Sequence, residues 1–264
     1  MIDIIGNIKI DENRPGATAD GKVIPHIRVK YFLATLLSFE FLAQSGTQVH
    51  LLINEPSFGL GNLLNKLKHE TKLNLQLLWP HLHTDYGVCM REMIKNSPNP
   101  YYLQFEEDHF CHLDYPQMME ALLEFAQRSS AGVIRSSFFN VETESAKTMK
   151  PFASHEAGNV YEMHQENFKA FNHKWPRFYL GTNCIFSKEF AKRFYARPGT
   201  RPHDYELAAF TPAFKHNCII PNYEILRSID DDHDTPDTCM LKQPTVKFIE
   251  CMKKADELMK KYYR

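Results

Sequence analysis

Short apolar stretches alternate with longer, helix-like segments over the first hundred residues. The strand-like stretches cover residues 2–10, 48–53, 73–78 and 101–105, and the helix-like segments cover residues 27–44, 60–70 and 85–96. This alternation predicts a mostly parallel sheet with helices on both faces. Crossovers of this length are right-handed almost without exception. We therefore expect an α/β fold, with a Rossmann-like, mixed and mostly parallel sheet flanked by helices.

The second half of the chain departs from this regular alternation. Residues 141–175 are polar and have little periodicity, so we expect a functional lid or a partly ordered insertion there. The expected strands cover residues 131–138, 179–186 and 217–221, and the expected helices cover residues 115–129, 188–195 and 205–215.

The last 22 residues, 243–264, predict an amphipathic C-terminal helix. Ile249, Met252, Met259 and Tyr262 share one face of it, and the segment carries six basic residues against three acidic ones. Such a helix either lies on a membrane surface or packs across the domain with its basic side in water. The apolar face is modest, which favours packing across the domain and leaves peripheral membrane contact as the alternative.

Bulk composition excludes several classes of protein. The formal net charge of −1 over 264 residues argues against broad electrostatic capture of nucleic acid, which needs a basic face. The six cysteines include no C-x-x-C pair, so neither a zinc knuckle nor a redox motif is expected. The amino terminus lacks a signal-peptide pattern, and the longest apolar stretch, residues 31–43, is too short to span a bilayer. We expect a reduced, cytoplasmic protein.

The fourth strand-like stretch ends abruptly in Glu106, Glu107 and Asp108. Side chains alternate along a strand, so Glu106 and Asp108 are expected to point to the same side. Two carboxylates held that close repel each other unless a cation or a proton lies between them. An acidic pair at the carboxyl end of a sheet strand predicts a hard metal ion and, through it, a bound phosphate. The alternative is a solvated strand end whose acids cap a neighbouring helix.

A second candidate group opens the helix that precedes this strand. Gly87 allows close approach of the backbone to a ligand, and Arg91 lies one turn further along, able to reach a phosphate or a base. The alternative is an ordinary helix start with Asp85 as its N-cap and a surface arginine.

Three further groups come later in the chain. Asp204 lies at the mouth of an expected helix beyond a Pro/Gly-rich loop, which suits a general base, although plain N-capping explains it as well. Gly181 and Asn183 precede it and could line a sugar pocket. The run of residues 230–234 places four aspartates around His233, a good Mn²⁺ ligand beside carboxylates, although such runs are usually solvated loops.

In this order, the pieces resemble a glycosyltransferase of the GT-A fold, most like the inverting family-2 type, over about residues 1–235. Residues 106–108 stand in place of the family's D-x-D, with a glutamate first, and residues 87–92 stand in place of its G-x-x-x-A-R-N-like helix. Residues 181–186 look like the family's G-G-N-x-x-F segment. Asp204 matches the acid of its E-D base motif, with His203 in place of the glutamate, and His233 matches a late histidine that completes metal binding.

The resemblance implies an enzyme that uses a nucleotide-diphosphate sugar as donor and a carbohydrate or other hydroxyl as acceptor, with inversion, in glycan or polysaccharide biosynthesis. It implies a domain over residues 1–242, with a nucleotide-binding half at 1–114 and an acceptor-binding half at 115–242, followed by the C-terminal helix at 243–264. The cofactor is Mn²⁺ or Mg²⁺. The implied roles are base for Asp204; metal ligands for Glu106, Asp108 and His233; donor contacts for Asp85, Gly87, Arg91, Glu106 and Glu107; and acceptor contacts for Gly181, Asn183 and Glu206.

Other classes of function stay open. A nucleotidyltransferase that makes nucleotide sugars would use a similar sheet and metal, but it usually carries a Gly-rich, basic loop after the first strand. Residues 11–16 offer one arginine and one glycine there. A non-catalytic nucleotide- or carbohydrate-binding protein on the same scaffold is a further alternative. A phosphohydrolase built on His203 and Asp204 would need a second, spaced H-D pair that the sequence lacks.

Overall fold

The computed structural model describes most of the first 135 residues and the C-terminal helix, with gaps elsewhere. The described residues are 1–10, 12, 16–17, 23–24, 26–54, 56–78, 85–135, 151–155, 158–163, 184–196, 216–221, 223–230 and 239–263.

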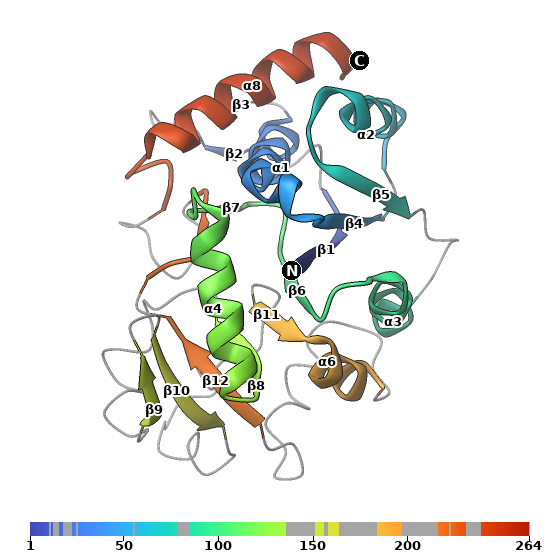
Figure 1. Cartoon of the computed structure of the whole chain (residues 1–264). Coiled ribbons are helices and arrows are strands. Elements are labelled where there is room, and N and C mark those ends of the chain that lie inside the picture. The colour runs from blue at the N-terminus through green and yellow to red at the C-terminus, as the bar shows by residue number, and fades with distance from the viewer. Residues whose placement is uncertain are drawn as a thin grey trace, which may run out of the picture.

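Nine strands of the described residues form one sheet that runs diagonally through the molecule (Figure 1). In spatial order they are β5 (Asn74–Leu78), β4 (Gln48–Ile53), β1 (Ile2–Ile8), β6 (Tyr101–Gln104), β11 (Cys184–Ser187), β8 (Ala131–Arg135), β12 (His216–Ile220), β10 (Gly158–Met163) and β9 (Pro151–His155). The first four pair in parallel, β11 is antiparallel to both of its neighbours, and β8 and β12 pair in parallel again. The expected mixed, mostly parallel sheet is confirmed.

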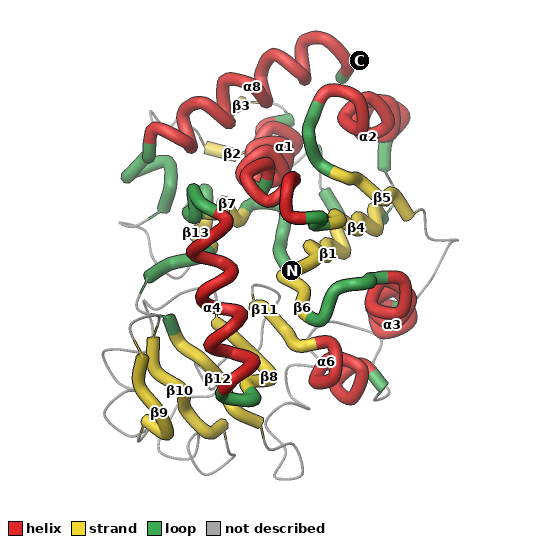
Figure 2. The backbone as a smooth tube through the Cα atoms, viewed as in Figure 1, coloured by secondary structure: helices red, strands yellow, loops and turns green. Residues whose placement is uncertain are grey.

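Helices cover both faces of this sheet (Figure 2). One layer holds α1 (Ile27–Ser38), α2 (Phe58–Glu70), α4 (Pro116–Arg128) and α8 (Val246–Tyr262), and the other holds α3 (Tyr86–Asn96) and α6 (Lys188–Tyr195). Neighbouring residues of β1 show the division, because Ile4 belongs to the core of the first layer and Ile5 to that of the second. Each layer therefore has its own apolar core.

Helix α1 lies at the centre of the first layer. All but one of its residues are buried, which explains the near-continuous apolar sequence there. The predicted helix over residues 27–44 is interrupted after Ser38, and a 3-10 helix (Glu40–Ser45) follows. That helix ends at Gly46, whose φ of 71° is a backbone conformation that favours glycine.

Helix α8 packs across α1 and α2. Its apolar side buries Phe248, Ala255 and Leu258. On its polar side, Lys254 pairs with Glu40 at 3.0 Å. The expected C-terminal helix is confirmed, and Met252, Met259 and Tyr262 pack against the domain as expected. The placement of Ile249 on the same apolar face is wrong, because its side chain is 57% exposed and the buried side is centred on Phe248, Ala255 and Leu258. No helix among the described residues combines the length and apolarity needed to cross a bilayer.

Two small pairs of strands lie outside the large sheet among the described residues. Strands β2 (Gly16–Ala17) and β3 (Val23–Ile24) pair with each other, as do β7 (His109–Cys111) and β13 (Leu226–Ser228). Strands β9 and β10 lie inside residues 141–175, where no strand was expected. Because β10 is held by pairing with the distant β12, its local sequence gave no sufficient signal. The helix expected at residues 205–215 lies outside the described residues.

Candidate functional site

The chain reverses its direction of travel across the sheet between β1 and β6. From β1 it goes to β4 and then to β5 on one side, and it returns to β6 on the other side of β1. In open α/β sheets, ligands bind in the crevice outside the carboxyl ends of the strands at such a switch point. The residues that leave β6 at this end, 105–109, are therefore well placed to contact a ligand.

The chain passes from β6 to β7 through Glu106, Glu107 and Asp108, and β7 begins at His109. These four residues are here called the acid turn. Strand β6 ends at Gln104, and Glu107 and Asp108 lie in a turn. The expectation that Glu106 and Asp108 lie on one side of a strand is therefore wrong in placing them in a strand. Phe105 donates the last hydrogen bond to β1, at Ile5, and the chain then leaves the sheet edge. The turn is fixed from α1, because the Thr35 hydroxyl donates to the carbonyl oxygen of Glu107 at 3.1 Å.

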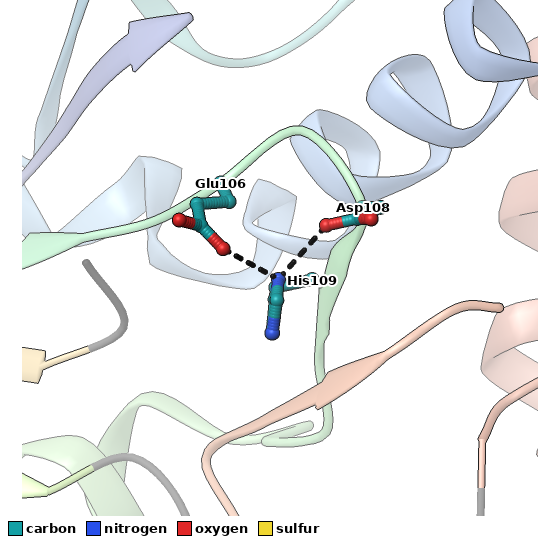
Figure 3. A group of neighbouring side chains, drawn as sticks. All are labelled: Glu106, Asp108 and His109. Atoms are coloured by element: carbon teal, nitrogen blue, oxygen red, sulfur yellow. Dashed lines mark hydrogen bonds and ion pairs between the residues drawn. The ribbon is translucent and has the colours of Figure 1, made fainter. Parts of the chain in front are cut away.

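The turn nevertheless brings Glu106 and Asp108 to one point, at the imidazole of His109 (Figure 3). Nδ1 of His109 lies 3.0 Å from Oδ1 of Asp108 and 3.7 Å from Oε2 of Glu106. One ligand atom from each of the three residues lies within 4.8 Å of the others. The arrangement is a compact group of two carboxylate oxygens and one ring nitrogen.

The second oxygen of Asp108 faces a buried arginine. Nη1 of Arg28, in the first turn of α1, lies 2.7 Å from Oδ2 of Asp108, and Nη2 lies 3.3 Å from Oδ2 of Asp230. The backbone joins the same segments, since Ile229 donates to the carbonyl oxygen of Asp108 at 2.7 Å. Residues from α1, the acid turn and the segment after β13 therefore meet at one guanidinium.

These neighbours shift the acid–base properties of the turn. Burial alone would raise the pKa of Asp108, but His109 and then Arg28 outweigh burial and lower that pKa to about 2. Burial opposes protonation of His109, yet the hydrogen bond and charge of Asp108 raise its pKa. Burial, followed by the charge of Asp108, raises the pKa of Glu107 to about 7. At neutral pH Asp108 is thus a fixed anion.

The donor set suits a divalent cation. Two ligands at right angles around Mg²⁺ lie about 3 Å apart, which is close to the separation of His109 Nδ1 from Asp108 Oδ1. Carboxylate oxygens with one imidazole are typical ligands of Mn²⁺. Glu106, Asp108 and His109 therefore fit such an ion.

The predicted donor-binding residues on α3 have partners within the protein. Asp85 caps the helix, accepting from the backbone of Gly87 at 2.7 Å. Gly87 is buried in the first turn. Nη1 of Arg91 donates to the carbonyl oxygen of Tyr195 at 2.6 Å, which joins α3 to the end of α6. The N-cap and surface-arginine alternative thus describes their contacts, and their role toward a nucleotide stays a prediction.

The start of α3 nevertheless lies beside the end of β6. The amide nitrogen of the Gln104 side chain donates to the Tyr86 hydroxyl at 2.6 Å, and the Tyr195 hydroxyl donates to the Gln104 side-chain oxygen at 2.6 Å. Gln104 precedes Glu106 by two residues. The buried side chain of Gln104 therefore holds the first turn of α3 close to the point where the chain enters the acid turn.

The other predicted site residues lie outside the described part of the chain. They are the base Asp204, the acceptor residues Gly181, Asn183 and Glu206, and the metal ligand His233. Their roles stay predictions.

Sequence reasoning missed His109, Arg28 and Asp230 as members of one group. His109 directly follows the acids, and a histidine after a carboxylate run was a usable signal for a ligand. Arg28 is a charged residue at the start of an otherwise apolar helix, which is a signal for a buried, paired charge. Nothing local indicated its partners, since Asp108 is 80 residues away.

Comparison with known proteins supports the fold. No protein-family model and no curated sequence matches the chain. In structure the chain is similar to S. aureus TarS 1–349, with a TM-score of 0.55 and 12% identity over 98% of this chain and 65% of that one. TarS 1–349 in complex with UDP-GlcNAc matches with a TM-score of 0.52 and 10% identity, over 97% of this chain and 65% of that one.

The mannosyltransferase PcManGT from Pyrobaculum calidifontis, in complex with GDP-Man and Mn²⁺, matches with a TM-score of 0.50 and 8% identity. That match covers 98% of this chain and 74% of PcManGT. The chain spans about two thirds of the length of TarS 1–349. These similarities show that the chain has the GT-A-like fold that its sequence resemblance implied.

Proposed function

We propose that the chain is a metal-dependent glycosyltransferase, moving a sugar from a nucleotide-diphosphate sugar to an acceptor hydroxyl. The observation that carries the proposal is the convergence of Glu106, Asp108 and His109 on one point beyond β6. That point lies at the switch point of a GT-A-like sheet, where a phosphate-containing ligand is expected. The fold neighbours that hold UDP-GlcNAc, or GDP-Man with Mn²⁺, add support.

Glu106, Asp108 and His109 would hold Mn²⁺ or Mg²⁺, with His233 as a further ligand. When bound, such an ion neutralises the charge that grows on a diphosphate leaving group. The Asp108 side chain is only 12% exposed and fixed on both oxygens, whereas that of Glu106 is 43% exposed and can adjust. In this proposal Asp108 fixes the position of the metal site, and the Glu106 side chain moves to complete the set of ligands when the ion binds.

The remaining roles follow from the family resemblance. Asp204 removes the proton of the acceptor hydroxyl as that oxygen attacks the anomeric carbon from the far side, which inverts the sugar. Asp85, Gly87, Arg91 and Glu107 contact the nucleotide. The residues proposed to contact the acceptor are Gly181, Asn183 and Glu206. The proposed setting is glycan or polysaccharide synthesis in the cytoplasm.

The test is a product assay with purified protein, Mn²⁺ and a panel of nucleotide sugars. Mn²⁺-dependent release of nucleoside diphosphate, accelerated by an acceptor, is the expected result. Pyrophosphate release from a nucleoside triphosphate and a sugar phosphate would identify a nucleotidyltransferase instead. Saturable binding of a nucleotide sugar without any turnover would identify a binding protein.

Glu106→Gln is the appropriate loss-of-function variant, because the exposed glutamate can change with little effect on folding. Asp256→Asn is the matched control, since Asp256 is a similarly exposed acid on α8 whose partners are Lys30 and Lys260. We expect Glu106→Gln to lose transfer and Asp256→Asn to keep it. Equal, Mn²⁺-dependent turnover in both variants would overturn the proposed site.

A further inference from the structure

Arg28 joins the acid turn to the segment after β13. It is 5% exposed, and its two terminal nitrogens contact carboxylates from different parts of the chain, Asp108 at 2.7 Å and Asp230 at 3.3 Å. The guanidinium is planar and presents its donors in a fixed fork. One side chain therefore bridges two segments that are more than a hundred residues apart in sequence, in addition to the backbone hydrogen bond from Ile229 to Asp108.

Stability alone does not account for this arrangement. Taking a guanidinium and two carboxylates out of water carries a desolvation cost that often equals or exceeds their mutual attraction. Replacement of such buried ion groups by well-packed apolar residues of similar volume is often neutral or stabilising. The neighbours of the arginine in α1, Ile27 and Val29, are buried and apolar. A role at the neighbouring site explains its presence better.

The contacts of Asp108 indicate what that role is. Its Oδ2 faces Arg28, and its Oδ1 faces His109. Because Arg28 holds Oδ2, Oδ1 is the oxygen that Asp108 presents toward Glu106 and His109. The contact with the arginine therefore accounts for which oxygen of Asp108 faces the site.

We propose, building on the glycosyltransferase function above, that Arg28 is a positioning residue. It orients Asp108 so that Oδ1 meets Glu106 and His109, and it holds Asp230 against the acid turn. As a permanent cation it also allows Asp108 and Asp230 to lie close together while no metal is bound. Lysine cannot take its place fully, because a single ammonium cannot span two carboxylates with a rigid fork.

Lys30 provides a matched control on the same helix. It lies two residues after Arg28 and pairs with Asp256 of α8 at 3.3 Å. That pair faces away from the acid turn and is partly exposed, at 23% and 41% for the two side chains. Lys30→Met thus removes a positive charge and an ion pair from α1 without touching the proposed site.

The experiment compares Arg28→Met, Arg28→Lys and Lys30→Met in the full chain. Hydrogen exchange of residues 105–110 and 228–230 is measured without metal, and Mn²⁺ affinity is measured by electron paramagnetic resonance. We expect Arg28→Met to speed exchange in both segments and to weaken Mn²⁺ binding at least tenfold. Arg28→Lys should recover part of the affinity, and Lys30→Met should match the wild type in both measurements.

A folded Arg28→Met protein with wild-type exchange in both segments and a Mn²⁺ Kd within threefold of the wild type would overturn the inference. If Arg28→Met does not fold, Asp230→Asn removes one partner and keeps the arginine paired with Asp108. We expect Asp230→Asn to speed exchange in residues 228–230 and to weaken Mn²⁺ binding by less than Arg28→Met does. Wild-type behaviour of Asp230→Asn would count against the inference in the same way.

Failure of the proposed function gives a different pattern. If the wild type bound neither Mn²⁺ nor any nucleotide sugar, the glycosyltransferase proposal would fall. The exchange comparison in the metal-free protein would still show whether Arg28 positions the acid turn.

Discussion

At the scale of single residues, the two oxygens of Asp108 have separate partners. Arg28 contacts one and His109 contacts the other, and together these two residues keep the carboxyl ionised with a pKa of about 2 despite burial. The acids themselves were predictable, because three carboxylates after an apolar strand are a local signal. Arg28 was not, because its contact with Asp108 joins residues 80 positions apart.

Glu106→Gln tests the ligand group with the least disturbance of folding. The side chain is 43% exposed, so we expect a change in unfolding free energy within about 0.5 kcal/mol, as for other surface substitutions. Loss of one charged ligand should weaken Mn²⁺ binding by about tenfold or more, in line with about 1.4 kcal/mol or more of lost interaction. Calorimetric titration with Mn²⁺ and urea unfolding measure the two quantities. A large loss of stability with unchanged Mn²⁺ affinity would show that Glu106 is structural.

His112 makes stability depend on pH. Burial, followed by the charges of Arg227 and Lys247, lowers its pKa from 6.5 to about 4. The unfolded chain binds the proton more tightly than the folded protein, so stability is fully present above pH 6.5 and falls as pH drops from 6.5 toward 4. Relative to His112→Gln, the wild type should lose about 2 kcal/mol between pH 7 and pH 5. Urea unfolding at both pH values measures this, and an identical loss in the variant would show that another group is responsible.

At the scale of secondary structure, the sequence predicted the helices and strands whose ends are determined by nearby residues. Strand β4 and helix α6 have the predicted bounds, Gln48–Ile53 and Lys188–Tyr195, because apolar periodicity and a serine cap define them. Strands β9 and β10 were missed, because β10 is held by pairing with the distant β12 and β9 is held by pairing with β10. The predicted end of β6 was also wrong, because the local sequence contains no Pro or Gly that would end the strand. Hydrogen bonds to Ile5 of β1 and to Thr35 of α1 determine where the chain turns.

Packing of α8 on the domain can be tested with two residues one position apart. Phe248 is 4% exposed and lies edge-on against Phe110, with ring centroids 5.2 Å apart, whereas Ile249 is 57% exposed. Phe248→Ala should cost about 3–5 kcal/mol of unfolding free energy, because it removes a buried ring and leaves a cavity. Ile249→Ala should cost within about 0.5 kcal/mol, as an exposed position. Urea unfolding of both variants measures the two losses of unfolding free energy. Similar losses for Phe248→Ala and Ile249→Ala would show that α8 does not pack as described.

At the scale of the whole molecule, the sheet order places the acid turn where a ligand is expected. Parallel strands β5, β4, β1 and β6 put their carboxyl ends on one edge, and the reversal of direction beside β1 opens that edge to a ligand. The alternation of strands and helices predicted this layout, whereas the contact of the segment after β13 with the turn depends on the completed fold. The proposed site thus combines residues from both halves of the chain.

The melting temperature with a nucleoside diphosphate, UDP or GDP, in the presence and absence of Mn²⁺ tests the central claim most directly. A ligand that binds the native state raises this temperature. We predict that the nucleotide and Mn²⁺ together raise it by more than the sum of their separate effects, and that Glu106→Gln abolishes the excess. A purely additive response in the wild type, or an equal excess in Glu106→Gln, would contradict a metal-held diphosphate at the acid turn.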